Sequence, residues 1–68
     1  MNMISVSSSN LHSIGWENGI LHIRFQSGSL YEYIGVPASI YNGLLEARSH
    51  GRFFSDYIKN QYAYKKIG

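Results

Sequence analysis

Cysteine is absent from this 68-residue chain, which excludes disulfide bridges and thiolate zinc sites. No apolar run is long enough to span a membrane, and the N-terminus has neither the basic nor the hydrophobic block of a signal peptide. These absences predict a soluble protein of the cytoplasm. At this length we expect one small domain, residues 1–68, near the lower size limit for a core that is stable without disulfides or bound metals.

Acidic residues are also scarce, and the charges are segregated along the chain. Residues 1–47 contain one arginine against three glutamates, a net charge of −2. Residues 48–68 contain five lysines and arginines against one aspartate, a net charge of +4. Segregated charge usually concerns a partner rather than the fold. The last third therefore predicts contact with a polyanion.

The dipeptide Asn18-Gly19 is the strongest hairpin signal, because a type I′ turn needs two positive φ angles and these residues tolerate them. With this loop, the facing pairs are Trp16 with Leu21, Ile14 with Ile23 and His12 with Phe25. Directly opposed residues share a face of the sheet. The two strands therefore present one predominantly apolar side.

A second turn is expected at residues 26–28, a three-residue loop with Gly28 in the left-handed position. This register places Tyr31 opposite Ile23 and Tyr33 opposite Leu21, so both tyrosines join the apolar face while Glu32 turns away. A two-residue loop would instead bury Glu32, and an unpaired buried carboxylate is costly. The three-residue loop is the better choice.

Two helices are expected after the sheet. Gly35-Val36-Pro37 ends the sheet and places proline in the first turn of a helix. Gly43 inside this helix indicates a close approach of the helix to the sheet, with a kink at Asn42-Gly43 as the alternative. A break at residues 49–51 precedes a shorter helix over residues 52–60. The apolar stripes of the two helices are Ile40, Tyr41, Leu44 and Leu45, then Phe53, Phe54, Tyr57 and Ile58.

The chain ends complete the predicted fold. Residues 3–6 have the composition of a short extra strand, residues 7–10 that of a polar connection, and residues 62–67 are extended or irregular. The expected fold class is α+β, a three- or four-stranded antiparallel meander with two C-terminal helices packed on one face.

Several short motifs follow one another along the chain: Ser7-Ser8-Ser9-Asn10, Gly15-Trp16, Leu21-x-Ile23-x-Phe25-x-Ser27-Gly28, Tyr31-x-Tyr33, Gly35-Val36-Pro37, Tyr41-x-x-Leu44-Leu45 and Gly51-Arg52-Phe53-Phe54. Their order and spacing resemble those of the KTSC domain family. The family is named after the C-terminal domain of some lysyl-tRNA synthetases and also occurs as small bacterial and phage-type proteins. The resemblance implies the same domain boundaries and a nucleic-acid hypothesis, since RNA binding has been suggested for the family, but it supplies no active site. Trp16 departs from the pattern and is expected only to enlarge the core.

Three groups of residues are candidates for function. Basic and aromatic side chains interleave in the last third, as phosphates and unstacked bases require. The candidate nucleic-acid-binding residues are Arg48, Arg52, Lys59, Tyr62, Tyr64, Lys65 and Lys66. A polar sheet-face patch is expected from His22, Arg24 and Glu32. Tyr31 and Tyr33 have two interpretations, a place in the core or a stacking platform for bases.

The predicted function is a non-catalytic binding module for RNA or another polyanion. One alternative is a protein-interaction module, such as a homodimer that pairs through a sheet edge, and another is a small nucleotide-binding protein. No metal site is expected, because the histidine spacing matches no ligand motif. No cofactor and no membrane partner is expected either. No serine, histidine or carboxylate constellation argues for an enzyme.

Overall fold

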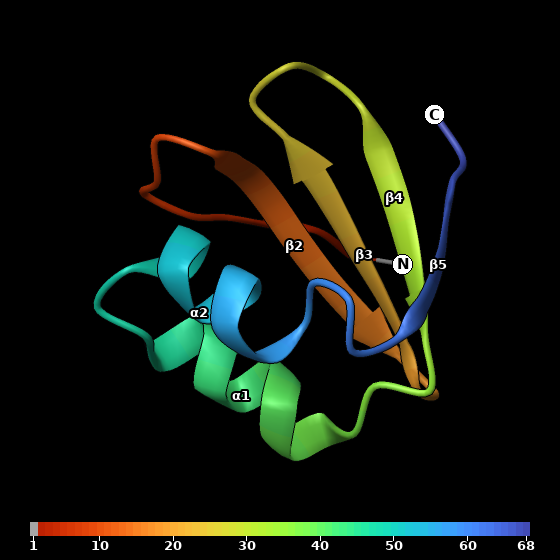
Figure 1. Cartoon of the computed structure of the whole chain (residues 1–68). Coiled ribbons are helices and arrows are strands. Elements are labelled where there is room, and N and C mark those ends of the chain that lie inside the picture. The colour runs from red at the N-terminus through yellow and green to blue at the C-terminus, as the bar shows by residue number, and fades with distance from the viewer. Residues whose placement is uncertain (1) are drawn as a thin grey trace.

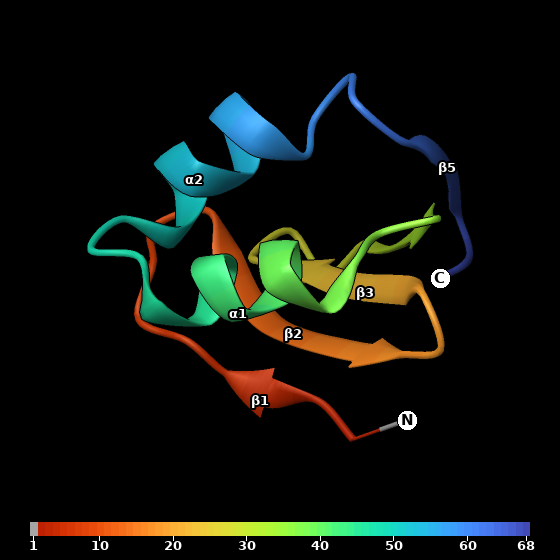
Figure 2. The ribbon, with the colours of Figure 1, turned by 90° about the horizontal axis from the view of Figure 1, so that it is seen from below.

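The computed structural model describes residues 2–68, which form five strands and two helices. In chain order these are β1 (Ile4–Ser5), β2 (Leu11–Glu17), β3 (Ile20–Phe25), β4 (Leu30–Ile34), α1 (Ala38–Glu46), α2 (His50–Tyr57) and β5 (Ala63–Lys66). The strands make one antiparallel sheet in the order β1-β2-β3-β4-β5. Both helices lie on the same side of this sheet (Figures 1 and 2). The α+β prediction is confirmed, with one more strand than the largest number expected.

The first hairpin has the expected turn, with a φ of 50° at Asn18 and 84° at Gly19. Its register is confirmed near the turn but changes at the far end, where Leu11 rather than His12 pairs with Phe25. The predicted pairing of His12 with Phe25 is wrong, because a β-bulge inserts His12 as an extra residue. The bulge leaves His12 exposed and buries Leu11 completely, which is the favourable exchange of a polar for an apolar side chain.

The second hairpin is confirmed. Gly28 has a φ of 97°, and the N–H of Phe25 donates to the carbonyl of Ser29 at 2.9 Å. Tyr31 lies opposite Ile23 and Tyr33 opposite Leu21. Both tyrosines therefore point to the face that the helices cover.

Two short strands form the edges of the sheet. The N-terminal strand expected within residues 3–6 is present as β1, which pairs with β2. The segment predicted as extended or irregular contains β5, which pairs with β4 and is exposed along its whole length. Pairing of two copies through either edge stays a prediction.

The second helix begins earlier and ends earlier than predicted. Ser49 caps it, because the Ser49 Oγ accepts a hydrogen bond from the N–H of Arg52 at 3.2 Å. Residues 50 and 51 are thus its first turn rather than part of a break. The helix ends at Tyr57, and Asn60 follows with a positive φ of 66°, which a continuing helix does not allow. Pro37 likewise sits at the N-cap of α1, one residue before the first turn.

The core lies between the sheet and the two helices. Its buried members are Leu11, Ile14, Leu21, Ile23, Tyr33, Val36, Leu44, Phe54 and Ile58. Trp16 packs against this core and donates its indole N–H to the carbonyl of Val36 at 2.7 Å. Tyr57 was expected in the helical stripe but is 54% exposed. Among residues 2–68, no helix has the length and apolar character needed to cross a membrane.

Candidate nucleic-acid interface

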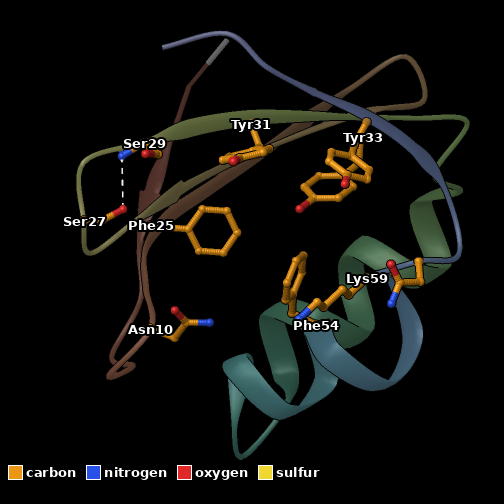
Figure 3. Close-up of a pocket in the computed structure, with 10 residues that line it drawn as sticks. Asn10, Phe25, Ser27, Ser29, Tyr31, Tyr33, Phe54 and Lys59 are labelled. Atoms are coloured by element: carbon orange, nitrogen blue, oxygen red, sulfur yellow. Dashed lines mark hydrogen bonds between the residues drawn. The ribbon is translucent and has the colours of Figure 1, made fainter.

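An open cavity of about 390 Å³ lies between the sheet and α2. Five aromatic residues line it: Phe25, Tyr31, Tyr33, Phe54 and Tyr64. Its remaining lining residues are polar or basic: Asn10, Ser27, Ser29, Lys59 and Asn60. Figure 3 shows Phe25, Tyr31 and Tyr33 on the sheet side and Phe54 on the helix side of this aromatic cavity. The arrangement offers apolar ring surface within a polar rim.

The register of the sheet sets the spacing of the rings. Tyr31 and Tyr33 are two residues apart on β4, so they share a face, and their ring centroids lie 6.5 Å apart in a stacked arrangement. Tyr64 on β5 is the direct cross-strand partner of Tyr33, with centroids 5.6 Å apart. Phe54 meets Tyr33 edge to face at 5.5 Å. With Phe25 on β3, four separate elements therefore build one aromatic wall of five rings.

Exposure differs sharply among the tyrosines of this wall. Tyr33 is 5% exposed, Tyr31 is half-buried and Tyr64 is 57% exposed. Burial raises the pKa of Tyr33 to about 12, and the neighbouring hydroxyls of Tyr31 and Tyr64 add to this shift. Tyr33 is therefore neutral near pH 7. Tyr33 belongs to the core, Tyr31 packs against it, and both line the cavity. Their use as a stacking platform for bases stays a prediction.

The predicted patch on the other side of the sheet is only partly assembled. The Nε2 of His22 lies 3.3 Å from Oε2 of Glu32, across the β3–β4 pair. Arg24 does not join them, because its guanidinium donates to the carbonyl of Gly28 at 2.8 Å. Lys65 takes that place, with its Nζ 3.7 Å from Oε1 of Glu32. These are partly exposed pairs, each worth at most about 1 kcal/mol.

The basic residues of the last third do not form one surface. Within β5, Lys66 lies opposite Tyr31 and so belongs to the face of the aromatic cavity, whereas Lys65 lies opposite Glu32 on the other face. Lys59 lines the aromatic cavity itself. Side chains alternate along a strand, so the two adjacent lysines of β5 point to opposite faces. Whether these residues contact nucleic acid stays a prediction.

Two arginines of the predicted set line a second cavity, of about 450 Å³, between the β1–β2 loop and the start of α2. Its lining residues are Ser7, Ser8, Ser9, Asn10, Arg48, Ser49, His50, Gly51, Arg52 and Ser55. We call it the arginine cavity. Asn10 lines both cavities. Tyr62, the last predicted residue, packs against the core and lines neither cavity.

Several lining residues were missed by sequence reasoning. Phe25 and Phe54 were assigned to the core alone, and residues 7–10 to a polar connection. The closely spaced serines and the asparagine of residues 7–10 were a usable signal for a polar site. The sequence does not show that this loop lies beside α2, where a Cβ on Gly51 would be 3.6 Å from Oγ of Ser8.

The three histidines of the chain make separate contacts. His12 is the bulge residue, His22 pairs with Glu32, and Nδ1 of His50 lies 2.7 Å from the carbonyl of Leu44. Within residues 2–68, no group of three or more histidine, aspartate or glutamate side chains is placed to hold a metal ion.

Comparison with known proteins identifies the family. The sequence model of the KTSC domain matches residues 7–62, most of the chain. This chain belongs to the KTSC family. It is 43% identical over 70 residues to an uncharacterized protein from Stutzerimonas stutzeri, covering 98% of this chain and 99% of that relative. The crystal structure of a KTSC domain protein from Yersinia pestis matches with a TM-score of 0.95 and 39% identity, over 98% of this chain and 97% of that one.

A second kind of relative is much longer. A lysine–tRNA ligase from a Nostoc species is 40% identical over 47 residues, which is 69% of this chain but only 8% of the ligase. A ligase from Nostoc punctiforme matches to the same extent. The KTSC domain here therefore corresponds to a small part of those enzymes. Its fifth strand, with Tyr64, follows the segment that the family model matches.

Proposed function

We propose that this KTSC domain is a non-catalytic binding module for single-stranded RNA, and that it takes one unstacked base into the aromatic cavity. The observation that carries the proposal is the aromatic wall of five rings with Lys59 at the same cavity. Single-strand binders combine aromatic surfaces, on which bases stack, with positive groups that contact the backbone.

The dimensions and the rim of the cavity agree with this ligand. Its volume of about 390 Å³ lies within the range of sites that bind small organic groups. The serine hydroxyls and asparagine amides of the rim are donors and acceptors that suit the edge of a base. Lys59 supplies a positive charge for the adjoining phosphate.

The ionisable groups of the cavity support binding rather than catalysis. Its lining residues include tyrosines and one lysine, but no carboxylate and no imidazole. Burial raises the pKa of Tyr33 to about 12, so its hydroxyl is a poor base near neutral pH. The names of the ligase relatives refer to tRNA, which supports RNA as the partner.

Fluorescence anisotropy with a labelled single-stranded RNA tests the proposal. Tyr64 is 57% exposed and lines the cavity, whereas Tyr57 is 54% exposed and does not, so the two form a matched pair. Tyr64→Ala is expected to weaken binding by about 5- to 150-fold, since a base–aromatic stack contributes about 1–3 kcal/mol. Tyr57→Ala is expected to leave binding unchanged. No binding by the unaltered protein at about 50 mM salt, where charge-driven binding is strong, contradicts the proposal.

A small nucleotide is the second candidate, favoured by the size of the cavity alone. Mononucleotides added as competitors distinguish the two ligands in the same assay. An RNA binder is displaced only by a large excess of mononucleotide, because the polymer gains further phosphate contacts. A nucleotide-binding protein is instead saturated by the mononucleotide at low concentration, with little dependence on salt.

A further inference from the structure

The arginine cavity has the chemistry of an anion site. It occupies about 450 Å³, and its lining includes Arg48 and Arg52 but no carboxylate. Arginine presents several N–H donors in a planar fork, which suits phosphate oxygens. Serines supply most of the remaining polar lining.

Two of these serines use the hydroxyl oxygen as a hydrogen-bond acceptor. The Oγ of Ser8 already accepts from the N–H groups of Asn10 and Leu11, each at 3.2 Å. The Oγ of Ser49 accepts from the N–H of Arg52 at 3.2 Å. A hydroxyl that is used as an acceptor keeps its proton to donate. Ser8 and Ser49 thus offer O–H donors, which an anion needs.

Neighbouring groups leave the arginines available. Arg52 pairs with Asp56 at 3.7 Å, but the two side chains are 82% and 56% exposed. An exposed pair of this kind contributes little, so a phosphate can replace the carboxylate. Nδ1 of His50 donates to the carbonyl of Leu44, so that nitrogen is not available to an anion.

The two cavities are neighbours. Asn10 lines both of them. The α2 helix supplies Phe54 to the aromatic cavity and the adjacent residue Ser55 to the arginine cavity. The β1–β2 loop runs past the start of α2 in the ribbon (Figure 2). The two cavities therefore meet at Asn10.

We infer that the arginine cavity binds the phosphate of a second nucleotide, adjacent to the one whose base occupies the aromatic cavity. This inference rests on the proposed function and extends it. The strand crosses the protein at Asn10, with a stacked base on one side and a phosphate held by Arg48, Arg52 and the serine hydroxyls on the other. The domain then reads a short run of single strand rather than one isolated nucleotide.

The test compares two double variants that remove the same charge. Arg48→Gln with Arg52→Gln removes both arginines of the cavity, and Arg24→Gln with Lys65→Gln removes two positive charges elsewhere on the chain. The probes are a labelled short oligouridylate and uridine monophosphate, titrated between about 50 and 200 mM salt. Each lost phosphate contact flattens the salt slope for a single strand by about 0.7. Because the two arginines hold one phosphate, the arginine variant is expected to flatten the slope by about 0.7. Binding of the monophosphate is expected to stay unchanged.

The outcomes separate this inference from the proposed function. If the salt slope for oligouridylate is unchanged in the arginine variant while the monophosphate still binds, the inference of a phosphate site in the arginine cavity is wrong. The proposed base site in the aromatic cavity is then unaffected. Equal losses in both double variants overturn it as well, because they indicate a general effect of net charge. If the unaltered protein binds neither probe, the proposed function fails and this inference with it. Arg48→Lys with Arg52→Lys keeps the charge, so it is expected to restore most of the slope and to show that the fold is intact.

Discussion

The ring of Phe53 in α2 lies directly against the backbone of Gly43 in α1, so that a Cβ on Gly43 would be 2.6 Å from Cζ of Phe53. The sequence predicted a close approach of this glycine to the sheet, and that prediction is wrong. The close approach is between the two helices. The Phe53 ring also packs against the ring of Tyr57, with centroids 4.6 Å apart. The aromatic ring has little room to withdraw without disturbing that contact.

Gly43→Ala is therefore expected to destabilise the protein, although alanine is the better helix former. Overpacking costs about 1–3 kcal/mol, and the gain in helix propensity offsets about 1 kcal/mol of it. The sign is expected to reverse in a Phe53→Ala background, where the same change stabilises by up to about 1 kcal/mol. Urea unfolding followed by Trp16 fluorescence measures all four proteins. The same effect of Gly43→Ala in both backgrounds would show that the two residues are not coupled.

The raised pKa of Tyr33 predicts that the protein loses stability at alkaline pH. Its pKa is raised to about 12 in the folded protein, mainly by burial, against an ordinary value of 10.0. The contribution is fully present below pH 10, where both states hold the proton. It is lost as pH rises toward 12, because the unfolded chain releases the proton first, at up to about 1.4 kcal/mol per pH unit. Tyr33→Phe is expected to lose less stability in this window. Parallel curves for Tyr33→Phe and the unaltered protein would contradict the assignment.

The fold was predictable where local chemistry fixes the backbone. The two turns were found because Asn18, Gly19 and Gly28 have positive φ angles, which few other residues adopt readily. The bulge at His12 and the strand β5 were not found. Residues 63–66 are all exposed and have no apolar alternation, so only their pairing with β4, distant in sequence, makes them a strand.

Gly28 provides a direct test of the second turn. Its φ is 97°, and a Cβ there would meet nothing within 4 Å, so the cost of substitution comes from the backbone alone. Gly28→Val is expected to destabilise by at least about 1–2 kcal/mol, since β-branched residues resist positive φ. Gly28→Asn is expected to cost less, because asparagine tolerates that region. Thermal unfolding of the two variants measures the difference, and equal midpoints would argue against the strained turn.

The candidate site was predictable only in its parts. Tyr31 and Tyr33 were placed on one face because the register followed from the two turns. The cavity they line depends on where α2 packs, and no local pattern specifies that distance. The basic residues were grouped by sequence proximity, which fails for Lys65 and Lys66 because adjacent strand residues point to opposite faces.

That division of the two lysines yields the last prediction. Lys66 lies opposite Tyr31 on the face of the aromatic cavity, whereas Lys65 lies 3.7 Å from Glu32 on the other face. Under the proposed function, Lys66→Gln is expected to flatten the salt slope for single-stranded RNA by about 0.7, the value of one phosphate contact, and Lys65→Gln to leave it unchanged. Both changes remove one charge, so net charge does not distinguish them. Anisotropy titrations over about 50 to 200 mM salt give both slopes.

Stability provides the matching control for that pair. Lys65→Gln removes the ion pair with Glu32 and is expected to cost at most about 1 kcal/mol, while Lys66→Gln, at an exposed position, is expected to cost less. The lysine that matters for RNA is thus not the one that matters for stability. Equal slopes for the two variants would mean that RNA senses only the overall charge of the chain and not the face that bears the aromatic cavity. That result would remove the structural basis for placing the strand on this face.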